Sequence, residues 1–191
     1  MNKTGKIIVV SAPSGCGKST IINSILGTGE IPMRFSVSAT NRAPRTGEVD
    51  GVNYHFFSTD EFLSAIANDE FVEWEQVYPG RYYGTLKREL TDAASRGENT
   101  ILDIDVKGAL KVKKLFGDDA LLIFIMPPSI DALRQRLIKR ATDSPEVIQE
   151  RVDKAEYEIS FAENFDKVIV NDDLTVAVAA TESAISDFLS K

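Results

Sequence analysis

Four short runs of apolar residues recur along the chain, and a segment with helical spacing follows each of them. The runs occupy residues 7–10, 101–106, 121–126 and 168–170. Runs of this length and composition are typical of strands that are buried on both faces, as in a parallel sheet covered by helices. Strands that alternate with helices predict an α/β fold in three layers, with a central parallel sheet flanked by helices.

The helical segments carry start signals and apolar stripes. We expect helices over residues 17–26, after Ser129, from Ser144-Pro145 onward, and from Val176 to the end of the chain. A helix-capping serine and a proline at the first helical position are both common helix starts. In the third helix the apolar residues repeat at helical spacing, namely Ile148, Val152, Ala155, Ile159 and Ala162. Each stripe predicts a helix face that packs on the sheet.

Residues 35–86 break this alternation. They contain short candidate strands over 34–40, 52–57 and 71–76, and a loop over 78–85. Between them, Ser58 and Glu61 have the spacing of a capping box at the start of a helix. We therefore predict a small mixed α/β insert at 35–86, within a core formed by residues 1–34 and 87–191.

Composition narrows the class of protein. The 191 residues are 43% hydrophobic, which suits one sizeable core, and the net charge of -7 argues against a nucleic-acid or anionic-membrane partner. Neither a signal peptide nor an 18-residue apolar stretch is present in this sequence, so we expect a cytoplasmic protein. With Cys16 alone, neither an intramolecular disulfide nor a cysteine-based zinc site is expected.

Basic residues are gathered in two places on this acidic chain. Residues 34–47 contain Arg34, Arg42 and Arg45 without an acidic residue, and residues 132–140 contain four basic residues without one. Two basic islands of this size indicate local anion sites and not a broad surface for a polyanion.

The segment after the first apolar run fits the nucleotide phosphate loop G-x-x-x-x-G-K-[ST], with alanine at the first position. Strand, loop and helix occur in the order that lets backbone N–H groups and a helix N-terminus enclose a phosphate. Lys18 is expected to reach the β and γ oxygens of ATP, and the Ser19 hydroxyl to bind Mg²⁺. The alternative is a chance glycine-rich turn. The predicted ATP-binding residues are Ala12, Pro13, Ser14, Gly15, Cys16, Gly17, Lys18, Ser19 and Thr20.

Cys16 lies inside this loop and has two interpretations. A helix N-terminus and Lys18 could lower the pKa of the thiol and make it reactive, in which case bound ATP should slow its alkylation. The simpler interpretation is that the position accepts any small side chain, and the sequence favours it because it offers no resolving cysteine.

Two carboxylates follow the second apolar run. Asp103 and Asp105 alternate along the predicted strand, which places them on one side at the edge where ligands of α/β sheets bind. Asp103 is thus a candidate to hold the water shell of Mg²⁺. The alternative is a pair of solvated acids at the end of a strand.

Residues 38–56 resemble the nucleotide-binding signature of the guanylate kinase family. Glu73 and residues 82–85, 103–105 and 170–173 follow in the family's order, so the likeness covers nearly the whole chain. Departures from the family's pattern are Asn41 in place of Ser or Thr, Ala141 in place of Gly, and one extra residue at 78–81.

The resemblance implies the residues of an acceptor site. The GMP phosphate would be bound by Arg42, Arg45, Tyr54 and Tyr83, and arginine forks with phenol hydroxyls suit a phosphate dianion. Guanine would be bound by Ser38, Glu73, Thr85 and Asp105. Adenine in that site would leave buried polar groups unpaired.

The resemblance also implies a short helical lid at about 130–155 and a contact of Asn171 with adenine. The lid arginines would be Arg136, Arg140 and Arg151, which neutralise charge on the transferring phosphoryl group. Together with Lys18, Arg42 and Asp103, they complete the expected catalytic set.

The expected activity is that of an ATP:GMP phosphotransferase, which also accepts dGMP and recycles GMP in purine nucleotide metabolism. Transfer would be direct and in line, with Mg²⁺ as cofactor and no covalent intermediate. Two alternatives stay open: a related kinase for another phosphorylated acceptor, and a non-catalytic module that binds phosphopeptides. Intact Lys18 argues against the second, and the sequence leaves monomer and homodimer equally open.

Overall fold

The computed structural model describes residues 4–139 and 144–191. Its core is a five-stranded, wholly parallel sheet in the order β2-β7-β1-β8-β9. The strands of this sheet are β1 (Ile7–Ser11), β2 (Met33–Phe35), β7 (Asn99–Asp103), β8 (Ala120–Met126) and β9 (Lys167–Val170). The predicted α/β class and parallel sheet are confirmed.

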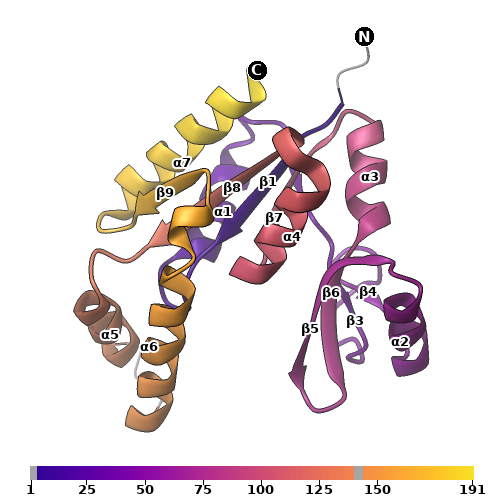
Figure 1. The fold of residues 1–191 in the computed structure, drawn as a ribbon, viewed down its shortest axis with the longest axis horizontal. Coiled ribbons are helices and arrows are strands. Elements are labelled where there is room, and N and C mark those ends of the chain that lie inside the picture. Colours follow the sequence, from indigo (N-terminus) through magenta and orange to yellow (C-terminus); the bar gives the residue numbers. More distant parts are fainter. Residues whose placement is uncertain (1–3, 140–143) are drawn as a thin grey trace.

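Helices cover both faces of this sheet (Figure 1). Alternate β1 residues point to opposite sides: Ile8 and Val10 face one cluster, and Ile7 and Val9 face the other. The first side carries α1 (Lys18–Thr28) and α7 (Leu174–Leu189), and the second carries α3 (Lys87–Ser95) and α4 (Val106–Phe116). The central strand is buried on both faces, which is why it has no polar alternation in the sequence.

The insert has its own mixed sheet, in the order β4-β3-β6-β5. Its elements are β3 (Ala39–Thr40), β4 (His55–Phe56), α2 (Thr59–Ala67), β5 (Phe71–Tyr78) and β6 (Arg81–Leu86). Phe62 of α2 stacks on Phe71 at 4.5 Å and on Tyr82 at 5.5 Å between ring centroids, and these rings form much of a separate small core. The predicted capping box is present, because Ser58 accepts from Glu61 N–H and Glu61 accepts from Ser58 N–H.

Several predicted boundaries in this region are wrong. The segment predicted as a loop over 78–85 is mostly strand β6, which forms a hairpin with β5 around Gly80 at φ 73°. The predicted strand over 34–40 is two strands, since β2 joins the core sheet and β3 the insert sheet. Only residues 55–56 of the expected strand over 52–57 are extended in a ladder.

The remaining two described helices form a pair that packs beside the phosphate loop between β1 and α1. These are α5 (Ile130–Lys139) and α6 (Pro145–Ile159), whose start is capped by Ser144 as predicted. The α5–α6 pair and the insert project from the same end of the sheet (Figure 1). Short 3₁₀ turns at Gly117–Asp119 and Ala162–Asn164 complete the described elements, and α7 starts two residues before the predicted Val176.

Candidate active site

The phosphate loop joins β1 to α1 and is a tightly folded turn. Gly15 and Gly17 have φ values of 96° and 85°, a backbone conformation that side chains disfavour, and Cys16 N–H donates to the Pro13 carbonyl at 3.2 Å. Helix α1 begins at Lys18 directly after this turn. Its first N–H groups thus point toward the loop, as a phosphate-binding site requires.

A residue near the C-terminal end of the chain, Asn171, also holds the phosphate loop. Asn171 follows β9, is 5% exposed, and donates from its side-chain amide to the Cys16 carbonyl at 2.8 Å. A Cβ on Gly17 would lie 2.6 Å from the same amide nitrogen. The sequence did not predict this contact, and the adenine contact of Asn171 stays a prediction.

Lys18, Ser19 and Asp103 lie together beside the loop. Lys18 forms an ion pair with Asp103, and the Ser19 hydroxyl lies 3.5 Å from the other Asp103 oxygen. They line a cavity of about 450 Å³ with the loop backbone and, from α6, Lys154 and Glu158. The sequence predicted Lys18, Ser19 and Asp103 as residues of this site. It gave no signal for Lys154 and Glu158.

A hydroxyl and a carboxylate so close together are hard oxygen donors, which Mg²⁺ prefers. Over the described parts of the chain, three or more acidic, histidine or cysteine side chains nowhere gather into a metal cage. Ser19 and Asp103 therefore fit an ion that arrives with a nucleotide and keeps much of its water.

Glu158 is the third carboxylate that lines this cavity, after Asp103 and Asp105. Its residue is only 8% exposed, and its carboxylate lies 3.9 Å from the Lys154 ammonium group. Burial raises the pKa of Glu158 above its ordinary value, and the positive charges of Lys154 and Lys18 oppose that rise.

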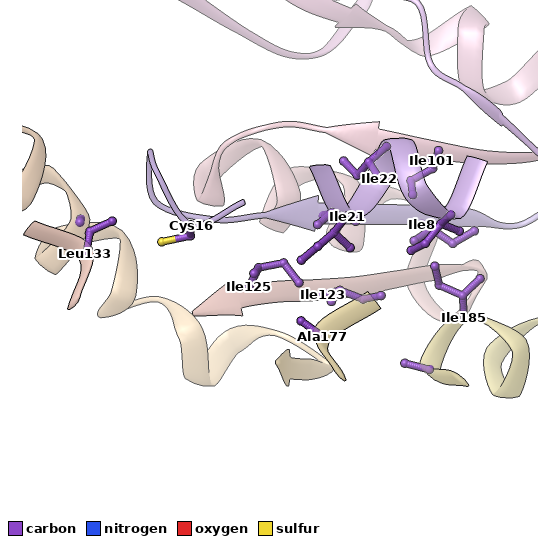
Figure 2. Close-up of a cluster of buried hydrophobic side chains, with 14 of the residues drawn as sticks. Ile8, Cys16, Ile21, Ile22, Ile101, Ile123, Ile125, Leu133, Ala177 and Ile185 are labelled. Atoms are coloured by element: carbon purple, nitrogen blue, oxygen red, sulfur yellow. The ribbon is translucent and has the colours of Figure 1, made fainter. Parts of the chain in front are cut away.

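Cys16 belongs to the hydrophobic core and not to the cavity wall. Its side chain is fully buried, and in Figure 2 the sulfur points toward Leu133 of α5. Burial raises the pKa of the thiol to about 12, an effect larger than the opposing ones of Arg136 and Lys18. The less favoured interpretation, a lowered pKa, is therefore wrong, because the loop turns this side chain away from the helix N-terminus into apolar surroundings.

In the insert, Arg42 stands at the centre of an aromatic and acidic cluster. Its guanidinium donates to both oxygens of Glu48 at 2.8 Å and lies 5.3 Å from the Tyr54 ring centroid. Tyr54 and Tyr83 meet edge to face at 5.9 Å, and Tyr83 lies close enough to Arg42 to raise the pKa of the guanidinium, after the larger effect of Glu48. Three of the four residues predicted for the acceptor phosphate are thus brought together.

Glu48 also organises the loop that carries Arg45. One of its oxygens accepts the Arg45 backbone N–H at 2.6 Å, and together with Arg42 this bond lowers the pKa of Glu48 to about 2. Arg45 is exposed and lines a second cavity of about 480 Å³ with Arg42. Arg81, at the start of β6, lines it too, although the sequence pattern predicted a loop in that segment.

Glu73 and Thr85 face each other across the β5–β6 ladder. The Thr85 hydroxyl donates to Glu73 Oε1 at 2.7 Å, and Thr85 is 1% exposed. Burial raises the pKa of Glu73, and the nearby Asp105 carboxylate raises it further. A Cβ on Gly108 would lie 2.9 Å from Glu73 Cγ, so glycine is needed for this approach of α4 to β5.

Asp105 does not lie on the strand, where alternation placed it. Strand β7 ends at Asp103, and Asp105 caps α4 by accepting the Gly108 N–H at 2.7 Å. It still lies beside Glu73 because α4 starts under β5. Ser38, the remaining predicted guanine contact, is half-buried, and its carbonyl accepts the His55 N–H at 2.9 Å.

The predicted lid residues lie on the α5–α6 pair. Arg136 of α5 donates to the Asp172 carbonyl at 3.4 Å, directly after Asn171. Arg151 lies on α6 and is half-buried. Arg140 and Ala141 lie outside the residues that the structure describes.

The model of one protein family, described as guanylate kinase, matches residues 4–188 of the chain. The chain belongs to the guanylate kinase family. This finding confirms the predicted family and the predicted enzyme class, a nucleotide-binding transferase (EC 2.7.4.8).

Individual relatives agree with the family. A guanylate kinase of Bacteroides fragilis is 54% identical over 98% of this chain and 93% of that protein, and one of Porphyromonas gingivalis is 52% identical over 97% and 99%. The crystal structure of a guanylate kinase from Anaplasma phagocytophilum is similar with a TM-score of 0.72 at 32% identity, over 99% of this chain and 88% of that one. Within the described residues, no helix is both long and apolar enough to cross a membrane.

Proposed function

We propose that this guanylate kinase transfers the γ-phosphoryl group of ATP in line to the phosphate of GMP to give ADP and GDP, and that it also accepts dGMP. The observation that carries the proposal is the pairing of Glu73 with Thr85 on the insert sheet that also holds the Arg42 and Tyr83 cluster. One sheet thus offers a carboxylate for a base and cations for a phosphate, beside a separate phosphate loop.

At the donor site, ATP would lie along the phosphate loop with its phosphates at the N-terminus of α1. In this structure the Lys18 ammonium group pairs with the Asp103 carboxylate. A bound triphosphate would offer Lys18 a stronger anionic partner. Ser19 and Asp103 would hold Mg²⁺, which when bound neutralises phosphate charge in the transition state. Asn171 would contact the adenine ring and keep the loop in shape.

At the acceptor site, Arg42, Arg45, Tyr54 and Tyr83 would bind the phosphate of GMP. Glu48 already holds Arg42 by two hydrogen bonds, so the guanidinium is oriented before the nucleotide arrives. An oriented cation loses little conformational entropy on binding, which favours affinity for the dianion. The phosphate itself is the nucleophile, so transfer needs no general base.

Guanine would be recognised by Glu73 with Ser38, Thr85 and Asp105. The N1–H and the 2-amino group of guanine donate, and the Glu73 carboxylate accepts. Adenine presents an acceptor at N1 and would leave the buried carboxylate facing a lone pair. A site with such unpaired polar groups discriminates strongly between substrates, by about 10⁴-fold in favourable cases.

The lid helices would complete the site around the transferring group. Arg136, Arg140 and Arg151 would neutralise the equatorial oxygens of the phosphoryl group, and closure would exclude water as a competing acceptor. We also propose a cytoplasmic location, ATP and GMP as the partners, and either a monomer or a homodimer.

A coupled assay for ADP release tests the proposal. GMP and dGMP are expected to support turnover, whereas AMP and UMP are expected to be poor acceptors. Lys18→Ala and Arg42→Met should each abolish GMP phosphorylation, and near-normal turnover in either variant would refute the assignment of that residue. Turnover highest with another acceptor would favour the alternative of a related kinase. Tight phosphopeptide binding without ATP would favour the binding module.

A further inference from the structure

The insert is connected to the core by two adjacent segments of chain. The first is Ser36–Ser38, between β2 and β3, and the second is the direct passage from β6 into α3. The change of partner is abrupt: Ser36 N–H donates to Ile101 in the core sheet, and the Ser38 carbonyl accepts the His55 N–H in the insert sheet, both at 2.9 Å. Val37 is therefore the residue at which the chain leaves one sheet for the other.

One carboxylate contacts both connections and the insert. Glu89, in the first turn of α3, accepts from the guanidinium of Arg34, the middle residue of β2, and from Val37 N–H at 3.3 Å. Its second oxygen lies 3.5 Å from Nε2 of His55 on β4. The Glu89 side chain is only 11% exposed, and a carboxylate so placed orders the groups that bond it because leaving them unpaired is costly.

Two polar atoms of the chain segment that enters this connection have no partner. Among the described residues, the Ser36 hydroxyl and the Arg34 Nε are buried without a hydrogen bond. Burying such groups costs free energy, and natural proteins satisfy most of them.

We propose that Glu89 is a positioning residue for phosphoryl transfer, because its bonds to Arg34 and Val37 and its contact with His55 fix the angle between the insert and the parallel sheet. The inference rests on the proposed acceptor site in the insert. It follows from the arrangement of the two phosphate sites, since the donor residues Lys18, Ser19 and Asp103 lie on the core, whereas Arg42, Tyr54 and Tyr83 of the acceptor phosphate site lie on the insert. An error in the angle between the sheets moves one phosphate relative to the other without changing the residues that bind either phosphate.

Glu89→Ala and Glu89→Gln test this role, with Glu98→Ala as the matched control. Glu98 also approaches Arg34, at 3.9 Å, but it pairs mainly with Arg96 and forms no bond to Val37 or His55. Glutamine keeps an acceptor for the Val37 N–H, so it should retain more activity than alanine. For each variant we would measure kcat for GMP, the Kd of GMP and of ATP by calorimetry, and Tm.

Glu89→Ala is expected to lower kcat at least about tenfold, since small misplacement of reacting groups has effects of this size. Both Kd values should change less than about threefold, because no side chain of either predicted site, as far as the structure describes them, is hydrogen-bonded to Glu89. Glu89→Gln should recover part of kcat, and Glu98→Ala should match the wild type.

An unchanged kcat in folded Glu89→Ala, or a kcat loss equal in Glu98→Ala, would overturn the inference. A weaker Kd for GMP at normal kcat would overturn it too. If Glu89→Ala does not fold, Glu89→Gln decides alone: normal kcat would contradict the role. A wild-type enzyme that does not phosphorylate GMP would instead contradict the proposed function, which this series detects separately.

Discussion

The side-chain amide of Asn171 donates to the backbone carbonyl of Cys16 at 2.8 Å, and so ties the end of the last core strand to the middle of the phosphate loop. Asn171 also donates its own backbone N–H to the Met126 carbonyl at 2.8 Å, which fixes the residue on β8. The loop is thus fixed in two ways: by its covalent connection to β1 and by the hydrogen bond from Asn171.

Asn171→Ala is expected to weaken binding of any triphosphate. The variant leaves the buried Cys16 carbonyl without its partner, which costs about 1–3 kcal/mol, and we expect roughly tenfold weaker binding of ATP. Calorimetry with ATP, GTP and inorganic tripolyphosphate separates the two roles of the residue. Equal losses for all three ligands indicate support of the loop, whereas a loss confined to ATP would show that the adenine contact dominates.

Gly17→Ala is expected to disrupt the donor site by the same contact. The new Cβ would lie 2.6 Å from the Asn171 amide nitrogen, at a residue with φ 85°. Gly29→Ala is the matched control, because φ there is 65° and nothing lies within 4 Å of the added atom. A left-handed backbone alone costs about 1–2 kcal/mol, so both variants should lose Tm. Only Gly17→Ala should lose ATP affinity, and equal affinities would contradict this reading.

The contacts of Asn171 and Cys16 illustrate what the sequence could and could not predict. The phosphate loop was predictable because strand, glycines, Lys18 and helix are consecutive, and their chemistry depends on local spacing. The partner that holds the loop is 155 residues away. Asparagine is common in turns for many reasons. No local sequence pattern therefore identifies Asn171 as the residue that holds the phosphate loop.

The insert was predicted less well for a related reason. Its strands are short, and Tyr78-Pro79-Gly80 was interpreted as the start of a long loop. In the structure this segment is a tight hairpin turn at Gly80, and β6 begins at the next residue. The face of β6 then decides which residues share a site. Thr85 and Tyr83 were identified through the family resemblance, whereas Arg81 on the same strand was missed.

Packing explains why the surroundings of Cys16 and the position of Asp105 differ from what spacing along the chain suggested. Cys16 and Asp105 were both placed by their distance along the chain from a motif, but their surroundings depend on packing. Cys16 turns into the core under α5, and Asp105 leaves the strand to cap α4. Sequence spacing gives the neighbourhood of such a residue, and the fold decides which way it points.

Cys16 should react slowly with iodoacetamide at pH 8, with or without ATP. A thiol whose burial raises its pKa to about 12 is almost wholly protonated at that pH, and the thiolate is the nucleophile. Mass spectrometry of the native and the denatured chain checks the expectation, because unfolding should restore ordinary reactivity. Rapid modification of the native protein, slowed by ATP, would show instead that the loop opens to solvent.

Arg42→Lys is expected to raise KM for GMP, although the charge is kept. Lysine cannot reproduce the two-point contact with Glu48 at 2.8 Å, so the cation would no longer be held in place for the phosphate. Arg96→Lys, at an exposed two-point pair with Glu98, is the matched control and should leave KM unchanged. Steady-state kinetics distinguishes them, and an equal KM in both variants would contradict the orienting role of Glu48.

Glu73 is expected to make GMP binding fail at mildly acidic pH. Its folded pKa lies above the ordinary 4.5, mainly because of burial, so the carboxylate that accepts from guanine is protonated earlier than an exposed one. KM for GMP should rise as pH falls toward that raised pKa, and the rise should be absent in Glu73→Gln, whose KM is high throughout. A pH profile of KM with the same limb in both enzymes would exclude Glu73 as its source.

The same shift predicts that Glu73→Gln stabilises the nucleotide-free fold. Because the folded pKa is above the unfolded one, the folded chain binds the proton more tightly, and the free energy of unfolding falls as pH rises between the two values. At neutral pH the ionised carboxylate therefore lowers stability, whereas glutamine keeps an acceptor for Thr85 without the buried charge. Thermal unfolding at pH 7.5 should give a higher Tm for the variant.

GMP should raise Tm in the wild type and much less in the variant, since ligand that binds only the folded state stabilises it by mass action. A lower Tm in nucleotide-free Glu73→Gln would show that the charge contributes to folding and not only to binding.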